Sequence, residues 1–312
     1  MSDVVLYLLL FVISLVVLVK ASDWFVEAAE RIGLSFGISP FVVGVTIVAF
    51  GTSLPELAAS VASVLRGESA IVINTVVGSN IANILLVMGL VAAFTKRVNL
   101  NLRVVDLEIP LLLSAAFLLW FVLRDQTVSI AEALLLLVGL VVFLLNSFRS
   151  EEEAADPDAE PAPQARAKDY GLLVLGGVLV YFGADYTVRA IQALSGMAGI
   201  SPGLIAVTLV AFGTSLPEIV VSIAAARKGN TGMVVGNVIG SNIFNIASIM
   251  GITALIVPLD VAPRLISTDM WVMAATTALL VVLTLMKGTI GRWGGAAMLA
   301  AYAGYLALFA AT

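Results

Sequence analysis

Residues Val48–Glu56 read VAFGTSLPE, and the same nine residues recur at Val210–Glu218. A second shared phrase follows each copy, GSNIANI from Gly78 and GSNIFNI from Gly240. The offset between the copies is 162 residues for both phrases (218 − 56 and 240 − 78). A repeat that stays in register over this distance indicates two copies of one structural unit.

The residues around these phrases are strongly apolar. Over the 312 residues of the chain, 61% are hydrophobic and 12% are charged, and the mean hydropathy is +1.09. Soluble domains carry roughly 25% charged residues, so this composition excludes a soluble globular protein. Apolar stretches of about 20 residues, enough for a helix to cross a bilayer, recur along the chain. The sequence therefore predicts an all-α membrane protein that lies in a lipid bilayer.

Histidine and cysteine are both missing from the sequence. Disulfides are therefore excluded, and so are the commonest metal ligand and the commonest general base. Only oxygen donors remain for binding a cation. We expect no cofactor and no nucleic-acid partner.

Hydropathy predicts ten spans, at about 4–29, 40–65, 70–94, 107–123, 128–148, 170–194, 202–227, 231–257, 268–286 and 291–311. The chain then divides into a first repeat half (1–148), an acidic linker (149–168) and a second repeat half (169–312). The linker is rich in Glu, Asp, Pro and Ala. Such a composition buries little apolar surface, so we predict a solvated, disordered connector.

Five spans in each half force the second half to enter the membrane from the opposite side, which makes the repeat inverted. Lys and Arg gather in cytoplasmic loops. If the N-terminus is outside, only Arg66, Arg124, Arg189 and Arg264 of the 16 basic residues fall in outward-facing loops. This distribution predicts that both termini lie on the outer side of the plasma membrane and that the linker lies in the cytoplasm. Inverted five-helix repeats are typical of secondary transporters, not enzymes.

The repeated phrase carries a proline inside each predicted span. Proline lacks an N–H and clashes with the carbonyl four residues earlier, which belongs to Gly51 for Pro55 and to Gly213 for Pro217. We expect a helix break at each proline. Backbone carbonyls freed there need a partner because lipid offers none, and a bound cation can serve.

The polar residues of each phrase share one helix face, since they are spaced three or four apart. The face also carries a glutamate roughly 15 residues into its span, and carboxylates at such a depth default to a functional role. An inverted repeat would gather both faces and the serines and asparagines of the second phrase into one site: Ala49, Thr52, Ser53, Glu56, Ser79, Asn83, Ala211, Thr214, Ser215, Glu218, Ser241 and Asn245. All of these donors are oxygens, which suits Ca²⁺ or Na⁺.

Other residues of the phrases have a structural interpretation of equal weight. Gly78 and Gly240 could serve close helix packing as readily as ion binding. For Asn80 and Asn242 we favour a structural role over ion binding, in which their side chains hydrogen-bond backbone groups at a helix break.

The inverted pair of phrases resembles the α-repeats of the cation/Ca²⁺ exchanger superfamily, most closely the prokaryotic Na⁺/Ca²⁺ exchangers, over essentially the whole chain. The resemblance implies ten helices, termini outside and a central cluster of four cation sites. It also implies alternating access, in which the first and sixth helices slide as a pair across the rest. The expected partners are Ca²⁺ and Na⁺, with H⁺ as an alternative, and the protein is expected to act as a monomer.

Carried over position by position, the resemblance implies that Glu56 and Glu218 are Ca²⁺ ligands that also serve Na⁺. It implies backbone carbonyls from Thr52, Thr214, Ala49 and Ala211, the alanines at the outer Na⁺ sites. It further implies hydroxyls from Ser53, Ser215, Ser79 and Ser241, and the family's central asparagine at Asn83. Asn245 departs from the pattern, because many of these exchangers have an aspartate there.

The expected function is an antiporter that exchanges Ca²⁺ for Na⁺. Two carboxylates balance one Ca²⁺ or two monovalent cations, which is the charge logic of competitive exchange. Ca²⁺/H⁺ exchange through the same site is the nearest alternative, because the missing acid at Asn245 leaves the counter-ion open. A passive cation channel and an intramembrane protease rank far below exchange.

Overall fold

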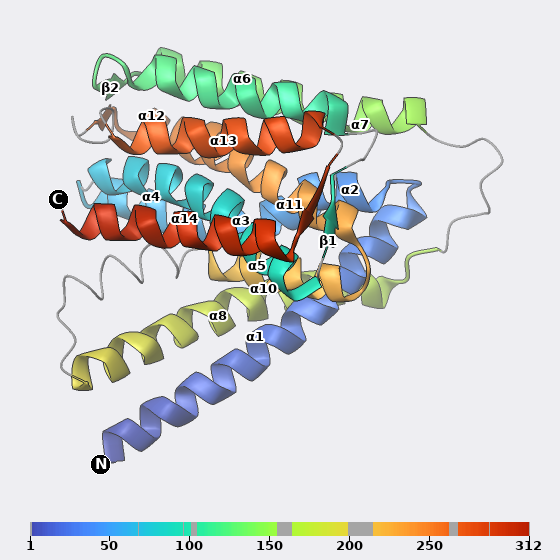
Figure 1. Cartoon of the computed structure of the whole chain (residues 1–312), viewed down its shortest axis with the longest axis vertical. Helices are drawn as coiled ribbons and strands as arrows, with labels where there is room; N and C mark the ends of the chain where they lie inside the picture. The colour runs from blue at the N-terminus through green and yellow to red at the C-terminus, as the bar shows by residue number, and fades with distance from the viewer. Residues whose placement is uncertain are drawn as a thin grey trace.

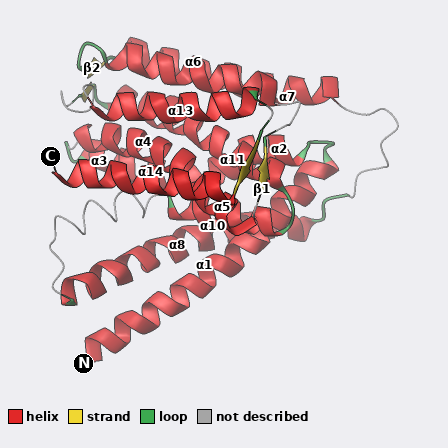
Figure 2. Ribbon diagram, viewed as in Figure 1, coloured by secondary structure: helices red, strands yellow, loops and turns green. Residues whose placement is uncertain are grey.

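The computed structural model describes residues 2–67, 69–95, 97–100, 105–154, 164–198, 215–261, 268–286 and 288–311. Nearly all of these residues are helical, and most of the helices run side by side across the molecule (Figures 1 and 2). Uninterrupted helices are α1 (Ser2–Ser35), α6 (Val105–Leu123), α7 (Ile130–Ala154), α8 (Ala167–Met197), α10 (Leu216–Arg227), α13 (Met270–Leu285) and α14 (Arg292–Ala311).

Three further spans combine α-helix with a five-residue π-helix. They are α2 (Pro40–Val43), η1 (Gly44–Val48) and α3 (Ala49–Leu65); α4 (Ser69–Ala82), η2 (Asn83–Val87) and α5 (Met88–Thr95); and α11 (Thr231–Phe244), η3 (Asn245–Ile249) and α12 (Met250–Ile256). The described helices coincide with the predicted spans to within a few residues at most ends. The first part of the seventh predicted span (202–214) lies outside the described residues.

Two short antiparallel ribbons, which the hydropathy pattern does not predict, join loops at opposite ends of the bundle. In one ribbon β1 (Arg97–Asn99) pairs with β4 (Thr289–Gly291), and in the other β2 (Thr127–Val128) pairs with β3 (Leu259–Asp260). Each ribbon ties a loop of the first half to a loop of the second half. The halves are therefore linked outside the membrane-spanning bundle as well as within it.

The predicted helix break at Pro55 is wrong, because α3 continues without interruption from Ala49 to Leu65 with Pro55 inside it. The departure from regular helix comes earlier, in the π-helix η1. Proline removes one backbone hydrogen bond, but the bonds of the flanking turns hold α3 together. π-Helical turns inside α-helices are frequent at functional sites, and η1 leads directly into the repeated phrase.

The acidic linker is shorter than predicted at both ends. Helix α7 extends to Ala154, and α8 begins at Ala167. The start of α8 is fixed by Asp169, whose Oδ2 accepts a 2.8 Å hydrogen bond from the backbone N–H of Arg166. Residues 155–163 lie outside the described residues, so the prediction of disorder is not tested there.

The third and eighth spans form the centre of the bundle. In each, 83% of the most apolar 18-residue window is buried, against 17% in α1. Close backbone contact holds the centre together: a Cβ on Gly44 would lie 2.4 Å from the carbonyl oxygen of Met233, and a Cβ on Gly240 would lie 2.3 Å from that of Val45. The packing interpretation is confirmed for Gly240 but is not seen for Gly78, where no described atom lies within 4 Å of an added Cβ.

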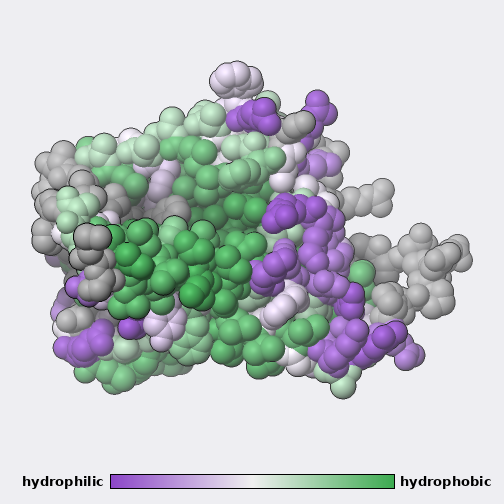
Figure 3. Space-filling model, turned by 90° about the horizontal axis from the view of Figure 1, so that it is seen from below, coloured by the Kyte–Doolittle hydropathy of each residue, from purple (hydrophilic) through white to green (hydrophobic). Residues whose placement is uncertain are grey.

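Helices α1 and α8 lie side by side as a pair that crosses the bundle at an angle (Figure 1). Glycines of α8 permit the contact, since a Cβ on Gly183 would lie 2.9 Å from Leu18 and one on Gly176 would lie 3.1 Å from Phe25. The molecule presents a broad hydrophobic surface on this side, with most hydrophilic residues gathered at one end and a smaller group at the other (Figure 3). Such a belt fits a lipid environment.

Both chain termini lie at one end of the bundle, and the end of α7 and the start of α8 lie at the other (Figure 1). Ion pairs join the elements at this second end. Arg31 of α1 lies 3.5 Å from Asp169 of α8, and Lys228, which follows α10, lies 3.3 Å from Glu27 of α1.

Candidate cation site

The two repeated glutamates are buried at the centre of the bundle. Glu56, in the middle of α3, and Glu218, in the first turn of α10, are each 1% exposed. Both carboxylate oxygens of Glu56 and the Oε2 atom of Glu218 have no hydrogen-bond partner among the described residues. Ser53 brings the two acids together, because it lies one turn before Glu56 and contacts Glu218. Such a pair is costly unless a cation compensates its charge.

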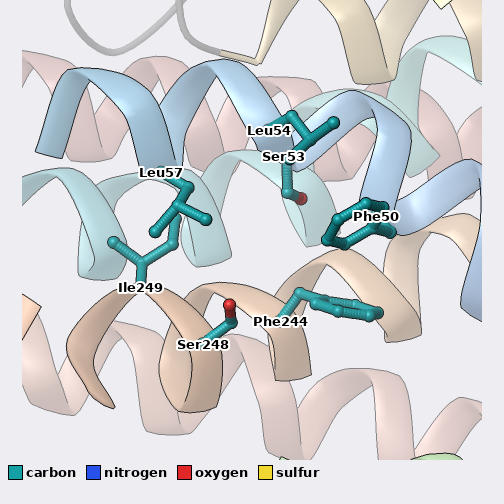
Figure 4. Close-up of a pocket in the computed structure, with 7 residues that line it drawn as sticks. All are labelled: Phe50, Ser53, Leu54, Leu57, Phe244, Ser248 and Ile249. Carbon is teal, nitrogen blue, oxygen red and sulfur yellow. The ribbon is translucent and has the colours of Figure 1, made fainter. Parts of the chain in front are cut away.

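Ser53 connects the two halves at this point. Its Oγ donates a 3.5 Å hydrogen bond to Oε1 of Glu218, while Ser53 itself lies one helical turn before Glu56. The hydroxyls of Ser53 and Ser248 point into a small cavity of about 10 Å³ between α3 and η3, which is otherwise lined by Phe50, Leu54, Leu57, Phe244 and Ile249 (Figure 4). The cavity has the size of about one water molecule, and it reaches a hydroxyl that contacts the carboxylate.

A second set of polar contacts surrounds Thr52, which is 1% exposed. Its hydroxyl lies 3.3 Å from the carbonyl oxygen of Ala49, 3.3 Å from Oδ1 of Asn237 and 3.5 Å from Oγ of Ser241. Asn237 in turn donates a 2.9 Å hydrogen bond from Nδ2 to Oγ of Ser222. The set joins α3, α10 and α11 one turn away from each glutamate.

The asparagines of the second phrase are buried with no hydrogen-bond partner among the described residues. Asn83 opens η2 and Asn245 opens η3, and both amide atoms of each side chain are unpaired. The same holds for Asn80 and Asn242, so their expected role as partners of backbone groups is not seen. An unpaired buried amide costs about 1–3 kcal/mol, and a cation bound by the amide oxygen would recover part of that cost.

The remaining predicted residues divide into three groups. Ser215 is fully buried, and its Oγ has no partner among the described residues. Ser79 and Ala49 are buried on the third and second spans. Ala211 and Thr214 lie outside the described residues, so their predicted positions are not tested.

Sequence reasoning missed several buried polar residues near the glutamates, among them Ser60, Ser222, Asn237 and Ser248. Asn237 precedes Ser241 by one helical turn, a spacing that was visible in the sequence. Asn237 was overlooked because candidate residues were those that match between the two copies, and the residue 162 positions earlier is Thr75. Ser248 was hidden in the same way, since Leu86 stands at its counterpart.

The chemistry of this site follows from its donor set. Carboxylate, hydroxyl, amide and backbone carbonyl oxygens are present, and no group of three His, Cys, Asp or Glu side chains occurs in the described part of the chain. Oxygen donors bind hard cations and do not select zinc or copper. Two carboxylates allow one divalent cation or two monovalent cations to bind with charge balance.

Comparison with known proteins identifies the family. The family model described as "Sodium/calcium exchanger protein" matches residues 6–149 and again residues 168–311. The chain belongs to the sodium/calcium exchanger family. The two matches each contain one copy of the repeated phrases.

Similar proteins agree with this assignment. The chain is 34% identical to "Sodium/calcium exchanger MaX1" of Methanosarcina acetivorans, over 96% of this chain and 97% of that one. It is also 34% identical to "Putative antiporter CaxA" of Alkalimonas amylolytica, over 94% and 95% of the two chains. Among solved structures, the sodium-calcium exchanger NCX_Mj soaked with zero Na⁺ and Ca²⁺ matches with a TM-score of 0.84 at 33% identity, over 98% and 99% of the chains.

Membership of this family confirms the predicted fold, ten membrane helices in two inverted five-helix repeats. It also confirms that the protein is a multi-pass membrane protein and a secondary antiporter, not an enzyme. The protease alternative is therefore ruled out. The counter-ion and the roles of individual residues are matters for proposal.

Proposed function

We propose that the protein exchanges Ca²⁺ for Na⁺ across the plasma membrane, with Glu56 and Glu218 as the shared cation ligands. The observation that carries this proposal is the pair of buried carboxylates, one from each inverted half, of which three of the four oxygens have no hydrogen-bond partner among the described residues. Glu56, Glu218 and the carbonyls of Thr52 and Thr214 would hold Ca²⁺. Asn83 and Asn245 would add amide oxygens for either ion. Na⁺ would compete for the same carboxylates, aided by Ala49, Ala211, Ser53, Ser79, Ser215 and Ser241.

Charge balance explains why exchange is obligatory in this scheme. Two bare carboxylates cannot cross a low-dielectric constriction cheaply, so the protein changes its facing only when cations neutralise them. One Ca²⁺ or two Na⁺ ions satisfy this condition. Ca²⁺ and Na⁺ therefore substitute for each other at the two carboxylates. They do not bind there together, because their combined charge would exceed that of the carboxylates.

The paired helices α1 and α8 provide the moving part of this proposal. They pack tightly on each other through Gly176 and Gly183 and cross the bundle as a unit. Sliding of the pair would open the site to one side of the membrane at a time. The excess of Lys and Arg in one set of loops supports a cytoplasmic linker and external termini, and we take the working unit to be one chain.

Ca²⁺/H⁺ exchange is the second candidate, and one observation favours it. Asn245 and Asn83, at matching positions of the two halves, both carry buried neutral amides, so neither adds a third carboxylate that would require an additional Na⁺ for charge balance. A proton can neutralise a carboxylate as well as Na⁺ can.

The experiment that separates the candidates is ⁴⁵Ca²⁺ uptake into proteoliposomes under an imposed Na⁺ gradient or an imposed pH gradient, applied separately. We expect uptake driven by internal Na⁺ at equal pH, and no uptake above protein-free vesicles with the pH gradient alone. Uptake driven only by the pH gradient would replace Na⁺ with H⁺ in the proposal. Uptake without any counter-ion would indicate a channel and overturn it.

A further inference from the structure

Asn237 lies between α3 and α10, the helices that carry Glu56 and Glu218. The first half has no asparagine at the matching position. Asn237 is 1% exposed on α11, and its side chain reaches Thr52 on α3, one turn before Glu56, and Ser222 on α10, one turn after Glu218. The 2.9 Å bond from Nδ2 to Ser222 is the shortest of its contacts and anchors the amide. Its Oδ1 atom is left facing the hydroxyls of Thr52 and Ser241, at 3.3 and 3.5 Å.

The Thr52 hydroxyl lies near three oxygens, and the two nearest, both acceptors, are at equal distance, while Oγ of Ser241 lies slightly farther away at 3.5 Å. Oγ1 of Thr52 lies 3.3 Å from the carbonyl oxygen of Ala49 and 3.3 Å from Oδ1 of Asn237. A hydroxyl carries one proton and donates one full hydrogen bond. If that proton points at Ala49, it covers the carbonyl oxygen that a cation would use. If it points at Asn237, both the Ala49 carbonyl and the hydroxyl oxygen present lone pairs to a cation.

We propose that Asn237 is a positioning residue for Na⁺: its Oδ1 accepts the Thr52 proton and thereby frees the Ala49 carbonyl and the Thr52 hydroxyl oxygen to bind the ion. This inference rests on the proposed Ca²⁺/Na⁺ exchange. Ser241 is oriented in the same sense, because it also lies in reach of Oδ1. Ca²⁺ depends less on this device, since the paired carboxylates supply most of its attraction.

The arrangement is specific to one half. The residue 162 positions before Asn237 is Thr75, and the residue 162 positions before Ser222 is Ser60. Ser60 is buried, and its Oγ has no partner in the described part of the chain. The carboxamide at position 237 therefore has no counterpart in the sequence of the first half.

The test compares Asn237→Leu, which keeps the size and removes the acceptor, with Asn237→Asp, which keeps an acceptor oxygen. The readout is ⁴⁵Ca²⁺ efflux from proteoliposomes as a function of external Na⁺, together with Ca²⁺/Ca²⁺ exchange without Na⁺. For Asn237→Leu we expect the Na⁺ half-saturation concentration to rise about 3- to 10-fold, the worth of one hydrogen bond. Ca²⁺/Ca²⁺ exchange should stay within about twofold of wild type, because Ca²⁺ relies on the carboxylates.

Two variants serve as references. Asn237→Asp should have a Na⁺ half-saturation no higher than wild type. Thr253→Val, which removes another buried hydroxyl of the same span, should leave it unchanged, because Thr253 bonds only carbonyls of its own helix among the described residues. In a Thr52→Val background, Asn237→Leu should add less than about a twofold increase, since coupled sites are not additive.

The outcomes separate this inference from the proposed function. No Na⁺-driven efflux in wild type would defeat the proposed function itself. Normal wild-type exchange with an unchanged Na⁺ half-saturation in Asn237→Leu, or an equal rise in Asn237→Asp, would overturn the role of Asn237 alone. If Asn237→Leu does not fold, Ser222→Ala releases the amide from its anchor and should raise the Na⁺ half-saturation in the same direction; an unchanged value there would overturn the role.

Discussion

The two copies of GTSLPE share every residue, yet their glutamates lie in different parts of a helix. Glu56 lies in the interior of α3, whereas Glu218 lies in the first turn of α10, which begins at Leu216. The positive end of a helix dipole stabilises a carboxylate only within its first turn. Among the described residues, Glu218 therefore has a favourable local field and a contact from Ser53, and Glu56 has neither. Identical sequence in an inverted repeat does not make identical ligands.

The same lesson holds for the second phrase. The span that carries GSNIFNI adds Asn237 and Ser248 at positions where the span of GSNIANI has Thr75 and Leu86. Both additions approach α3, one through Thr52 and the other across the cavity beside Ser53. The second half thus supplies the polar contacts that organise the first half's phrase.

The comparison is tested most severely by removing one charge from either half. Glu56→Gln and Glu218→Gln each keep the size of the side chain and remove a charged ligand. Cation binding should lose at least ~3 kcal/mol, because the bound cation stays buried with one carboxylate fewer. We expect Na⁺-dependent ⁴⁵Ca²⁺ uptake to fall by about 100-fold or more in both. Glu132→Gln, at an exposed helix start, is the matched control and should retain wild-type uptake.

Equal loss in both variants would show that the two different environments still make one shared site. Wild-type uptake in either variant would contradict the assignment of that glutamate as a ligand.

The asparagines provide a second comparison between the halves. Asn83→Leu and Asn245→Leu remove buried amides that have no hydrogen-bond partner among the described residues, so the cation-free protein should be no less stable, because an apolar isostere lifts a desolvation cost of about 1–3 kcal/mol. The Ca²⁺ concentration for half-maximal uptake should rise about 10-fold, since an oxygen ligand is lost. Thermal unfolding in detergent with and without Ca²⁺, together with uptake, measures both effects.

Lower stability without Ca²⁺ and unchanged Ca²⁺ dependence would assign these asparagines to packing instead. A change in only one variant would show that the halves differ at this position too.

The close contact between η1 and α11 is the next feature to break. Gly44→Ala and Gly240→Ala each place a Cβ within 2.4 Å of a backbone oxygen, and overpacking of this kind costs roughly 1–3 kcal/mol. We expect a lower unfolding temperature for both in a detergent-based thermal assay. The control Gly304→Ala has no described atom within 4 Å of the added Cβ and should be tolerated; equal behaviour of all three would refute the close packing.

The smallest effect is expected from Asp185, an acid in the interior of α8. Asp185 forms a 2.9 Å ion pair with Arg189 on the surface of α8, and exposed pairs contribute about 0–1 kcal/mol. Asp185→Asn should change neither Ca²⁺ uptake nor the unfolding temperature measurably. A large loss of uptake would show that this acid, like the two glutamates, lies on the ion path.

Much of this account could be predicted from the sequence, because long apolar segments and an exact repeat are strong signals. The burial of Glu56, Glu218 and Ser53 also followed from the repeat. The π-helices at Asn83 and Asn245 did not, since no local residue pattern marks a helical turn that widens by one residue. The continuity of α3 through Pro55 was missed because helix propensity cannot weigh the packing that sustains the flanking turns.

The most direct measurement is equilibrium ⁴⁵Ca²⁺ binding to the purified protein in detergent, with Na⁺ as competitor. The account predicts one Ca²⁺ per chain that Na⁺ displaces in wild type, and no binding at the same free Ca²⁺ in Glu56→Gln or Glu218→Gln. Undiminished binding in both variants, or binding that Na⁺ cannot displace, would contradict a site shared by the two glutamates.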